Sequence, residues 1–455
     1  MDSPSHRACG IAAGRLNLAD YAANFSDAHP PLNRAQALIE AERCYYCYDA
    51  PCTTACPTSI DVPAFIARIA QDNVRGAARE ILTANPLGGM CSRVCPTEQL
   101  CEQACVRNTQ EDKPVEIGAL QRYATDAFMA SGGAPLFQRA AATGRKVAVV
   151  GAGPAGLTCA HQLALQGHEV VLFDARPKLG GLNEYGLASY KTPGDFAQKE
   201  IDWLLSVGGI TPRNNQRLGR DFTLDSLLAE HDAVFLGLGL AGVNALGAAE
   251  PQAEGLRNAV DFIADIRQTA DKSTVPVGRR VVVIGGGMTA VDASVQARLL
   301  GADEVTMFYR RGKDALSASW VEQEWAQTHG VNLRLWAAPQ EILVQDGKVC
   351  GVRMACTRME GDRLQVTQEV FDVPADMVLK AIGQTYVATP AGAAIALRDG
   401  RIDTDDEGRT SVPRVWAGGD CRAGGQDLTV QAVEHGKVAA RAMHQALTSA
   451  VAAGV

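Results

Sequence analysis

One glycine-rich turn constrains the fold of this 455-residue chain more than any other stretch. It follows an apolar run at Lys146–Val150 and opens a helical pattern at residues 157–165, and a second apolar run, Glu169–Phe173, ends in Asp174. Such glycines let the backbone approach a pyrophosphate at a helix start, and the acid binds a ribose hydroxyl. The context predicts a dinucleotide-binding domain rather than an ordinary strand–helix turn. The turn reads Gly151-Ala152-Gly153-Pro154-Ala155-Gly156.

A second turn of this kind lies further along the chain. The apolar run Arg280–Ile284 leads into Gly285, Gly286 and Gly287, and the residues from Thr289 to position 300 follow a helical pattern. The next predicted strand, at residues 305–309, ends in Arg310 and Arg311 instead of an acid. A carboxylate would bind the 2′-hydroxyl of NAD(H), whereas arginines suit the 2′-phosphate of NADP(H). The alternative is that both arginines are solvated surface residues.

Cysteines are concentrated near the N-terminus, where eight of the 13 lie between positions 44 and 105. The spacings are Cys44-x2-Cys47-x4-Cys52-x3-Cys56-Pro57 and Cys91-x3-Cys95-Pro96-x4-Cys101-x3-Cys105. Compact spacings with a Cys-Pro pair in each run are typical of ferredoxin-type iron–sulfur ligation. Zinc ribbons and a disulfide scaffold are the alternatives. Spacing alone would make Cys91 the eighth ligand of two iron–sulfur clusters.

The same region resembles the N-terminal helical iron–sulfur domain of dihydropyrimidine dehydrogenase. The shared motifs are CxxCxDAPCxxxCP at residues 44–57, NPLGxxCxxVCPTxxLCxxxC at residues 85–105 and PVEIGALQRYATD at residues 114–126. The resemblance implies two [4Fe–4S] clusters and leaves Cys91 without a ligand role. By this resemblance the first cluster is held by Cys44, Cys47, Cys52 and Cys105, and the second by Cys56, Cys95, Cys101 and the amide oxygen of Gln121.

The remainder of the chain is similar to the FAD/iron–sulfur subunit of the bacterial NAD-dependent form of that enzyme. In such flavoproteins a loop like the one containing Gly181 and Leu182 runs beside the flavin, and the segment at Gly383 marks the crossover between domains. Gly419 and Asp420 match a second FAD motif, whose acid contacts the ribityl hydroxyls. The glutamate synthase small subunit is related, but its second cysteine group is spaced more tightly.

The resemblance implies an electron-input function. NAD(P)H would be oxidised through FAD, and two [4Fe–4S] clusters would carry electrons to a partner FMN/iron–sulfur subunit that interconverts uracil or thymine and their 5,6-dihydro forms. A barrel for FMN needs about 250 residues, which the chain does not have to spare, so we expect a heteromeric complex, by resemblance a heterotetramer. The alternative is a glutamate synthase-like input subunit feeding another acceptor. Hydride transfer between stacked rings requires no catalytic acid or base.

Composition and the remaining sequence argue against several other classes of protein. A net charge of −8 argues against nucleic acid or an anionic membrane as a partner, and no apolar run approaches the ~20 residues of a membrane span. The first 25 residues lack the apolar core of a signal peptide, so we expect a cytoplasmic protein. A disulfide reductase would need a redox CxxC in the nucleotide domains, which contain none. The interpretation as a structural protein with vestigial nucleotide sites would not explain why both glycine-rich turns are intact.

The expected architecture is an α/β protein with an all-helical iron–sulfur domain followed by two Rossmann-like domains, the FAD domain being discontinuous. Other expectations are a helical stretch at residues 62–83, a buried strand at residues 233–240, and a closing helix at residues 429–447 with a frayed end at residues 448–455. The expected domains are residues 1–135 (iron–sulfur), 136–243 (FAD, first part), 244–386 (NAD(P)) and 387–455 (FAD, second part).

Overall fold

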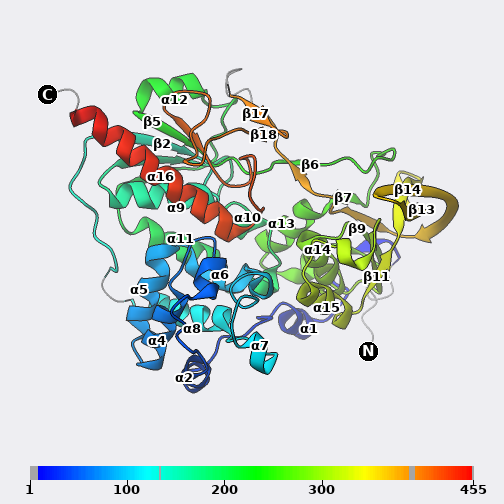
Figure 1. Ribbon diagram of the computed structural model, residues 1–455. Coiled ribbons are helices and arrows are strands. Elements are labelled where there is room, and N and C mark those ends of the chain that lie inside the picture. Colours follow the sequence, from blue (N-terminus) through cyan, green and yellow to red (C-terminus); the bar gives the residue numbers. More distant parts are fainter. Residues whose placement is uncertain (1–8, 133–134, 389–394, 453–455) are drawn as a thin grey trace. The chain divides into compact units, whose positions relative to one another are not determined.

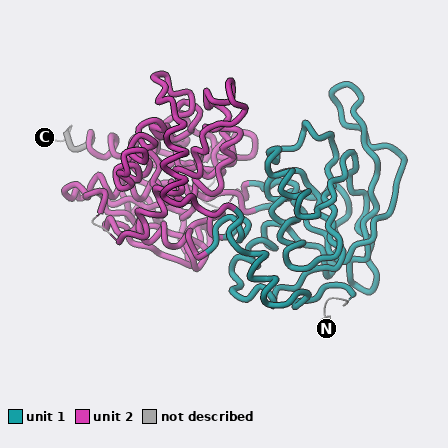
Figure 2. Tube along the Cα trace, turned by 90° about the horizontal axis from the view of Figure 1, so that it is seen from below, with its two compact units in different colours: residues 1–28, 185–193, 242–385 teal, residues 29–184, 194–241, 386–455 magenta. Residues whose placement is uncertain are grey.

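The computed structural model describes residues 9–132, 135–388 and 395–452, and its chain divides into two compact units (Figure 2). Unit 1 comprises residues 1–28, 185–193 and 242–385. Unit 2 comprises residues 29–184, 194–241 and 386–455. Each unit contains one five-stranded sheet made only of parallel pairs, which is the arrangement that two Rossmann-like domains require.

The N-terminal part of unit 2 is helical and encloses a small apolar core around Phe65, Ile66 and Leu120. The predicted helix at residues 62–83 is two helices, because Asp72 adopts a left-handed conformation (φ 56°) and Asn73 caps a new helix through Gly76. The helices are α2 (Arg34–Glu42), α3 (Pro51–Ala55), α4 (Val62–Ala70), α5 (Val74–Ala84), α6 (Gly88–Val94), α7 (Asn108–Glu111) and α8 (Ile117–Ala130), with a 3-10 turn η1 (Thr97–Gln99) (Figure 1).

The rest of unit 2 is an α/β domain whose strand order is β19-β5-β2-β3-β4. Val147, Val149 and Phe235 pack on one face against α9, α11 and α16, while Ala148 and Val234 pack on the other face against α12. The elements are β2 (Lys146–Val150), α9 (Pro154–Leu165), β3 (Glu169–Phe173), α10 (Leu182–Tyr185), α11 (Phe196–Leu205), β4 (Ile210–Arg213), α12 (Leu224–Glu230), β5 (Ala233–Leu236), β17 (Leu397–Arg398), β18 (Arg401–Ile402), β19 (Val415–Ala417) and α16 (Thr429–Ala452).

Two expected boundaries in this domain differ from the structure. Strand β5 ends at Leu236 instead of continuing to residue 240, because the Gly237 carbonyl turns toward Gly151, where an added Cβ would meet it at 2.2 Å. Helix α16 continues to Ala452, past the expected end at residue 447. The alanine-rich end of α16 favours this continuation, since alanine has the highest helix propensity. Residues 453–455 of the expected frayed end lie outside the described residues.

Unit 1 is built on the sheet β11-β10-β9-β15-β7. Val281, Val283 and Met307 pack on one face against α13, α14 and α15, and Val282 and Phe308 pack on the other against the antiparallel sheet β12-β13-β14. The strands are β1 (Ile11–Ala12), β6 (Gly242–Val243), β7 (Leu256–Asn258), β8 (Val277–Gly278), β9 (Arg280–Ile284), β10 (Glu304–Tyr309), β11 (Val331–Leu335), β12 (Ala337–Gln345), β13 (Lys348–Glu360), β14 (Arg363–Pro374), β15 (Met377–Lys380) and β16 (Gln384–Thr385). The helices are α1 (Leu18–Asn24), α13 (Ala259–Gln268), α14 (Met288–Leu299) and α15 (Trp320–Thr328), with 3-10 turns η2 (Ser189–Lys191), η3 (Lys272–Thr274) and η4 (Lys313–Ala315).

Two segments distant in sequence complete unit 1. Strand β1 pairs with β8, and Nε of the buried Arg15 donates to the Val277 carbonyl at 3.1 Å. The largely buried side chain of Lys191 lies between Asp292 and Glu322, at 2.7 and 2.6 Å. The described part of residues 1–28 and the segment 185–193 therefore group with the second nucleotide domain, whereas the sequence-based division placed them in the iron–sulfur and FAD domains. Among the described residues, no helix is long and apolar enough to span a lipid bilayer.

Candidate functional site

The first glycine turn forms a backbone cradle at the start of α9. Gly151 has a φ of 96°, and a Cβ on Gly156 would meet the Gly151 carbonyl oxygen at 1.8 Å, so neither position has space for a side chain. Gly153 precedes Pro154 and caps α9 without a side-chain hydrogen bond. The first amides of α9 are therefore available to an anion, as a pyrophosphate site requires.

The predicted FAD residues in unit 2 gather around this turn. Asp174 accepts hydrogen bonds from the amides of Ala152 and Arg176, both at 2.8 Å, which fixes its carboxylate at the end of β3. A Cβ on Gly181 would meet the Gly153 Cα at 2.7 Å, so the loop that leads to the half-exposed Leu182 lies directly against the turn. These positions fit the phosphate and ribose parts of a dinucleotide.

The second FAD motif lies against the same helix start. A Cβ on Gly419 would be 3.0 Å from the Ala155 Cβ, and the Gly419 amide donates to His435 Nδ1 at 3.2 Å. Burial raises the pKa of Asp420 to about 6, an effect that Asp427 increases and Arg401 opposes. A buried carboxylate of this kind is stabilised when hydroxyl groups donate to it, so the chemistry of the site fits a ribityl chain.

Gly383 has a different setting from the other predicted FAD residues. It has a φ of 91° and lies in unit 1, where its carbonyl accepts a hydrogen bond from the Asn244 amide at 3.1 Å. The left-handed conformation explains why glycine occupies this position. A flavin contact by Gly383 stays a prediction.

The second glycine turn has the same local geometry in unit 1. Gly285 has a φ of 150°, and its Cβ would meet the Ala381 carbonyl oxygen at 2.1 Å. A Cβ on Gly286 would lie 2.5 Å from the Tyr309 ring, and Gly287 caps α14, whose first turn includes the half-buried Thr289. The cradle is shaped for a second dinucleotide.

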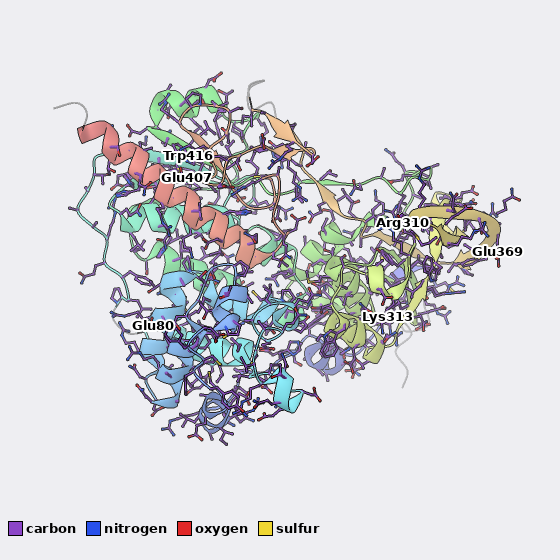
Figure 3. The ribbon with its side chains drawn as sticks, viewed as in Figure 1. Glu80, Arg310, Lys313, Glu369, Glu407 and Trp416 are labelled. Carbon is purple, nitrogen blue, oxygen red and sulfur yellow. The ribbon has the colours of Figure 1, made fainter. Side chains whose placement is uncertain are left out.

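Arg310 and Arg311 are exposed immediately after β10 (Figure 3 labels Arg310). Within the described part of the chain, neither guanidinium group takes part in an ion pair. Both arginines are therefore accessible to a phosphate, which leaves the choice between NAD(H) and NADP(H) to experiment.

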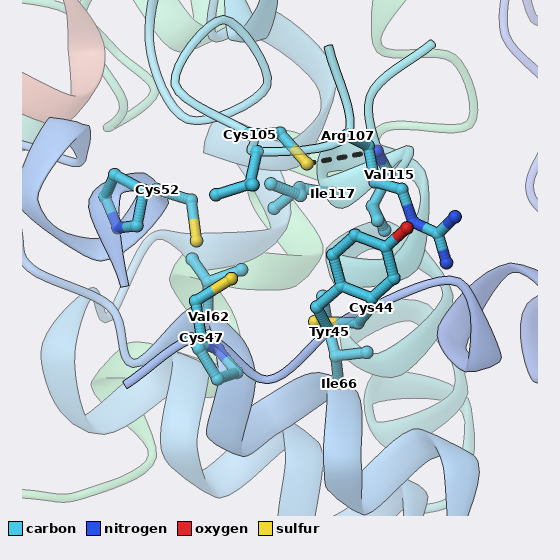
Figure 4. A pocket seen from close by; sticks show the side chains of 13 residues that line it. Cys44, Tyr45, Cys47, Cys52, Val62, Ile66, Cys105, Arg107, Val115 and Ile117 are labelled. Atoms are coloured by element: carbon cyan, nitrogen blue, oxygen red, sulfur yellow. Dashed lines mark hydrogen bonds between the residues drawn. The ribbon is translucent and has the colours of Figure 1, made fainter. Parts of the chain in front are cut away.

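Four of the predicted cluster ligands line one pocket. Figure 4 shows the sulfur atoms of Cys44, Cys47, Cys52 and Cys105 around a space that Val62, Ile66 and Ile117 also border. The Tyr46 amide donates to Cys44 Sγ at 3.4 Å, and the Val115 amide donates to Cys105 Sγ at 3.5 Å. Amide donors stabilise thiolates bound to a cluster and influence its potential.

The other predicted ligands form a second group. The pKa of Cys95 is raised by a hydrogen bond with Cys91, by burial, and by the neighbouring Cys101 and Cys56. Gln121, on α8, is buried, and its Nε2 donates to the carbonyl of Gly88, in the first turn of the helix α6 that leads to Cys95, at 2.6 Å. Because this bond uses the amide nitrogen, Oε1 is the side-chain atom that could bind iron. Cys91 is also adjacent to Cys95, so the geometry alone does not exclude it as a ligand.

The alternatives to iron–sulfur ligation fit less well. All 13 cysteines are free thiols in the structure, contrary to a disulfide scaffold. Among the residues that the structure describes, no three Cys, His, Asp or Glu side chains are arranged to hold a single metal ion. Cys44, Cys47, Cys52 and Cys105 border a common pocket, which is the arrangement that a cluster bound by four thiolates requires.

Sequence reasoning missed a residue that connects the cysteine region to the FAD domain. Glu200, on α11, is fully buried and accepts hydrogen bonds from the amides of Gly89 and Met90, at 2.7 and 3.1 Å. These amides belong to the first turn of α6, which leads to Cys95. The sequence contains no local signal for this contact because the partners are 111 and 110 positions apart.

Comparisons with protein families match the two parts of the chain separately. Residues 21–133 match the model described as dihydropyrimidine dehydrogenase domain II, 4Fe-4S cluster. Residues 145–436 match the model described as pyridine nucleotide-disulphide oxidoreductase. The second match covers well over half of the chain and both glycine turns.

Relatives with full-length similarity are known. The chain is 35% identical to the glutamate synthase [NADPH] small chain of Escherichia coli K12, over 91% of this chain and 92% of the relative. It is 34% identical to the NAD-dependent dihydropyrimidine dehydrogenase subunit PreT of the same organism, over 92% of this chain and 97% of the relative. The similarity to the family expected from the sequence is confirmed, and a second subfamily matches equally well.

Solved structures confirm the fold. The chain aligns with Mycobacterium tuberculosis FprA, with a TM-score of 0.59 and 19% identity, over 68% of this chain and 86% of that one. It aligns with thioredoxin reductase from T. acidophilum, with a TM-score of 0.53 and 22% identity, over 68% of this chain and 99% of that one. Together with the family matches, these findings show that the chain belongs to the pyridine nucleotide-disulphide oxidoreductase family, as an NAD(P)-dependent oxidoreductase with an N-terminal 4Fe-4S domain.

Proposed function

We propose that this chain is the electron-input subunit of a dihydropyrimidine dehydrogenase. It oxidises NAD(P)H through FAD and passes electrons by way of two [4Fe–4S] clusters to a partner FMN/iron–sulfur subunit. The partner interconverts uracil or thymine and their 5,6-dihydro forms, and the two subunits form a heterotetramer in the cytoplasm. FAD, when bound, accepts a hydride and releases electrons singly, which suits clusters that accept one electron at a time.

The observation that carries this proposal is the placement of the two cysteine groups within unit 2. Lys437 of α16 donates to the Thr58 carbonyl at 2.9 Å, and the Thr58 hydroxyl is 3.3 Å from Cys56 Sγ. Glu200 binds the start of α6, and Cys95 directly follows the end of this helix. The second group therefore lies beside the FAD domain. A cluster there is suited to receive electrons from the flavin.

The first cysteine group borders the surface instead. Tyr45 lines its pocket and is 47% exposed, and the neighbouring Tyr48 is fully exposed. The guanidinium group of Arg107 lies 3.9 Å from the centre of the Tyr45 ring. Exposed tyrosine and arginine side chains are enriched at protein interfaces. This face gives an electron-accepting partner access to the first cluster.

A glutamate synthase-like input subunit is the second candidate. The sequence similarity to the glutamate synthase small chain supports it directly. The Cys95-x5-Cys101 spacing and Gln121 favour the pyrimidine enzyme. The two candidates share the electron-input chemistry and differ in the partner subunit.

The test uses the purified chain with FAD and iron–sulfur clusters in place. We expect it to oxidise NADH or NADPH with an artificial acceptor and to leave uracil and thymine unreduced. Pyrimidine reduction should appear only after the native partner is added or co-purified. Reduction of uracil by the single chain would contradict the proposal that a separate subunit reduces the pyrimidine. A native partner that forms glutamate from 2-oxoglutarate and glutamine would establish the second candidate.

A further inference from the structure

The carboxyl edge of the sheet in unit 1 brings a tryptophan beside the arginine pair. Strands β10 and β11 are parallel, with Tyr309 opposite Leu335 in the register. The residues that follow the two strands, Arg310 and Trp336, therefore emerge next to each other. Gly285 follows β9 at this same edge, where parallel sheets bind nucleotides.

The backbone at Trp336 is held in an unusual conformation. Its φ of 59° lies in the left-handed region, which a bulky residue seldom adopts. Its amide donates to the Arg311 carbonyl at 3.4 Å, and its carbonyl accepts from the Thr357 amide at 2.8 Å. The Thr357 hydroxyl donates to the Arg310 carbonyl at 2.8 Å, so Thr357 ties the two loops together. Strain maintained in this way occurs frequently at ligand-binding sites.

The indole itself is accessible. Trp336 is 38% exposed although its side chain is large and apolar. The ring lies over Gly312, where an added Cβ would be 2.8 Å from its Cζ2 atom. A side chain at position 312 would displace the indole, so glycine at this position allows the ring to contact the loop while part of it stays open to solvent.

The surroundings of the ring carry positive charge. Arg310, Arg311 and Lys313 are all exposed on the loop beneath it (Figure 3 labels Arg310 and Lys313). None of the three forms an ion pair with another described residue. An aromatic surface next to unpaired cations matches a purine base whose ribose carries a phosphate, since the base stacks and the phosphate accepts charge-assisted hydrogen bonds.

We propose that Trp336 is the surface on which the adenine ring of the nicotinamide nucleotide stacks. Arg310, Arg311 and Lys313 then face the 2′ position of the adenosine ribose. The inference rests on NAD(P)H as the electron donor. It predicts a separation of roles, because the adenine is common to NADH and NADPH whereas the 2′-phosphate is not. Trp336 therefore contributes to the binding of both nucleotides, and the cations discriminate between them.

The test compares Trp336→Ala, Trp336→Phe and the control Trp320→Phe in the holoenzyme. Trp320 is 63% exposed and lies in the same unit, at the start of α15. Trp336→Ala should raise KM for NADH and NADPH by the same factor, about 5- to 150-fold, because stacking of a base on an aromatic ring is worth roughly 1–3 kcal/mol. Trp336→Phe keeps a ring and should restore most of the affinity. Flavin absorbance and circular dichroism show whether each variant is folded.

A second readout does not depend on turnover. Binding of 5′-AMP should quench the tryptophan fluorescence of the wild type and of Trp320→Phe, and this quenching should disappear in Trp336→Phe. Unchanged KM values in Trp336→Ala, or full quenching in Trp336→Phe, would overturn the inference. If the variants gave either of these contradicting results while the wild type oxidised NAD(P)H normally, only the role of Trp336 would be wrong. The proposed function would still stand. A wild type that bound neither nucleotide would overturn both.

Discussion

The buried carboxyl group of Glu200 accepts a hydrogen bond from the backbone nitrogen of Gly89 at 2.7 Å. The two residues are 111 positions apart and join the FAD domain to the helix that leads to Cys95. The helix α6 has no side-chain cap of its own, so Glu200 satisfies amides that would otherwise be unpaired. One acidic side chain thus fixes the position of a predicted cluster ligand relative to the flavin domain.

Removing this contact should destabilise the helical region. Glu200→Ala leaves the buried amides of Gly89 and Met90 without a partner, at a cost of about 1–3 kcal/mol in the free energy of unfolding. Glu200→Gln keeps an oxygen acceptor and should cost less. The melting temperature of the apoprotein and the iron content of the purified variant measure the two effects. Glu80→Gln, on the surface of α5, is the control (Figure 3 labels Glu80).

The same residue should make stability depend on pH. Burial raises the pKa of Glu200 from 4.5 to about 8, against the opposing amides and Arg93. Above pH 4.5 the unfolded chain loses this proton while the folded chain retains it, so stability falls as pH rises toward 8. In Glu200→Gln this decline should be smaller than in the wild type. Identical pH profiles of the melting temperature would show that Glu200 does not titrate in this range.

Asp420 should make FAD binding dependent on pH. Burial raises its pKa to about 6, so the carboxylate of the apoprotein is increasingly protonated below that pH and accepts ribityl hydroxyls less well. FAD affinity should therefore decrease as pH falls through 6. Asp420→Asn should weaken binding at pH 7.5 by about 1.5–3 kcal/mol, the value of hydrogen bonds to a charged group, and should remove the pH dependence. Fluorescence titration of the apoprotein with FAD measures both.

The control for this titration is Asp427→Asn. Asp427 is half-exposed, forms an ion pair with Arg401 at 2.6 Å, and contributes to the raised pKa of Asp420. Its replacement leaves the predicted ligand intact and should shift the midpoint of FAD binding to lower pH. A pH dependence that persists in Asp420→Asn would assign the effect to another group.

Arg310→Ala should change the choice of nucleotide. If the guanidinium group binds the 2′-phosphate, KM for NADPH should rise about 10- to 150-fold, as expected for the loss of a charge-assisted contact worth roughly 1.5–3 kcal/mol. KM for NADH should change little. Arg363→Ala, at an exposed position of β14, is the matched control. Equal effects on both nucleotides would leave the arginines as surface charges and would favour strict use of NADH.

Cys91 and Gln121 compete for the last ligand position. With Gln121 as the ligand, Cys91→Ser should retain about eight iron atoms per chain, the content of two [4Fe–4S] clusters. Gln121→Ala should lose iron or alter the EPR spectrum of one cluster. Cys350→Ser, at an exposed cysteine, is the control. Loss of a cluster in Cys91→Ser with an unchanged spectrum in Gln121→Ala would reverse the assignment.

A substitution at Gln121 can also change the cluster potential. A neutral amide in place of a thiolate removes one negative charge and makes the cluster easier to reduce. Gln121→Cys, if its thiolate ligates, should lower the reduction potential measured by anaerobic EPR titration. A rise in the potential would contradict ligation by Gln121.

The sequence alone determined the local elements around both glycine turns. Strands β2 and β9 and helices α9 and α14 form where the pattern predicts them, because strand and helix periodicity and glycine spacing are properties of neighbouring residues. The break at Asp72 also had a local signal, since Asn73 is a favourable helix cap. The helical patterns on both sides of the break instead predicted a single helical stretch at residues 62–83.

Only the tertiary structure decided which distant segments pack together. Arg15 and Lys191 anchor their segments in unit 1, Glu200 anchors α6, and Trp336 lies beside Arg310 because two parallel strands are in register. Helix and strand periodicity in the sequence gives no signal for any of these contacts. They arise from burial and hydrogen bonding between residues far apart in the chain, which a reading of neighbouring positions does not contain.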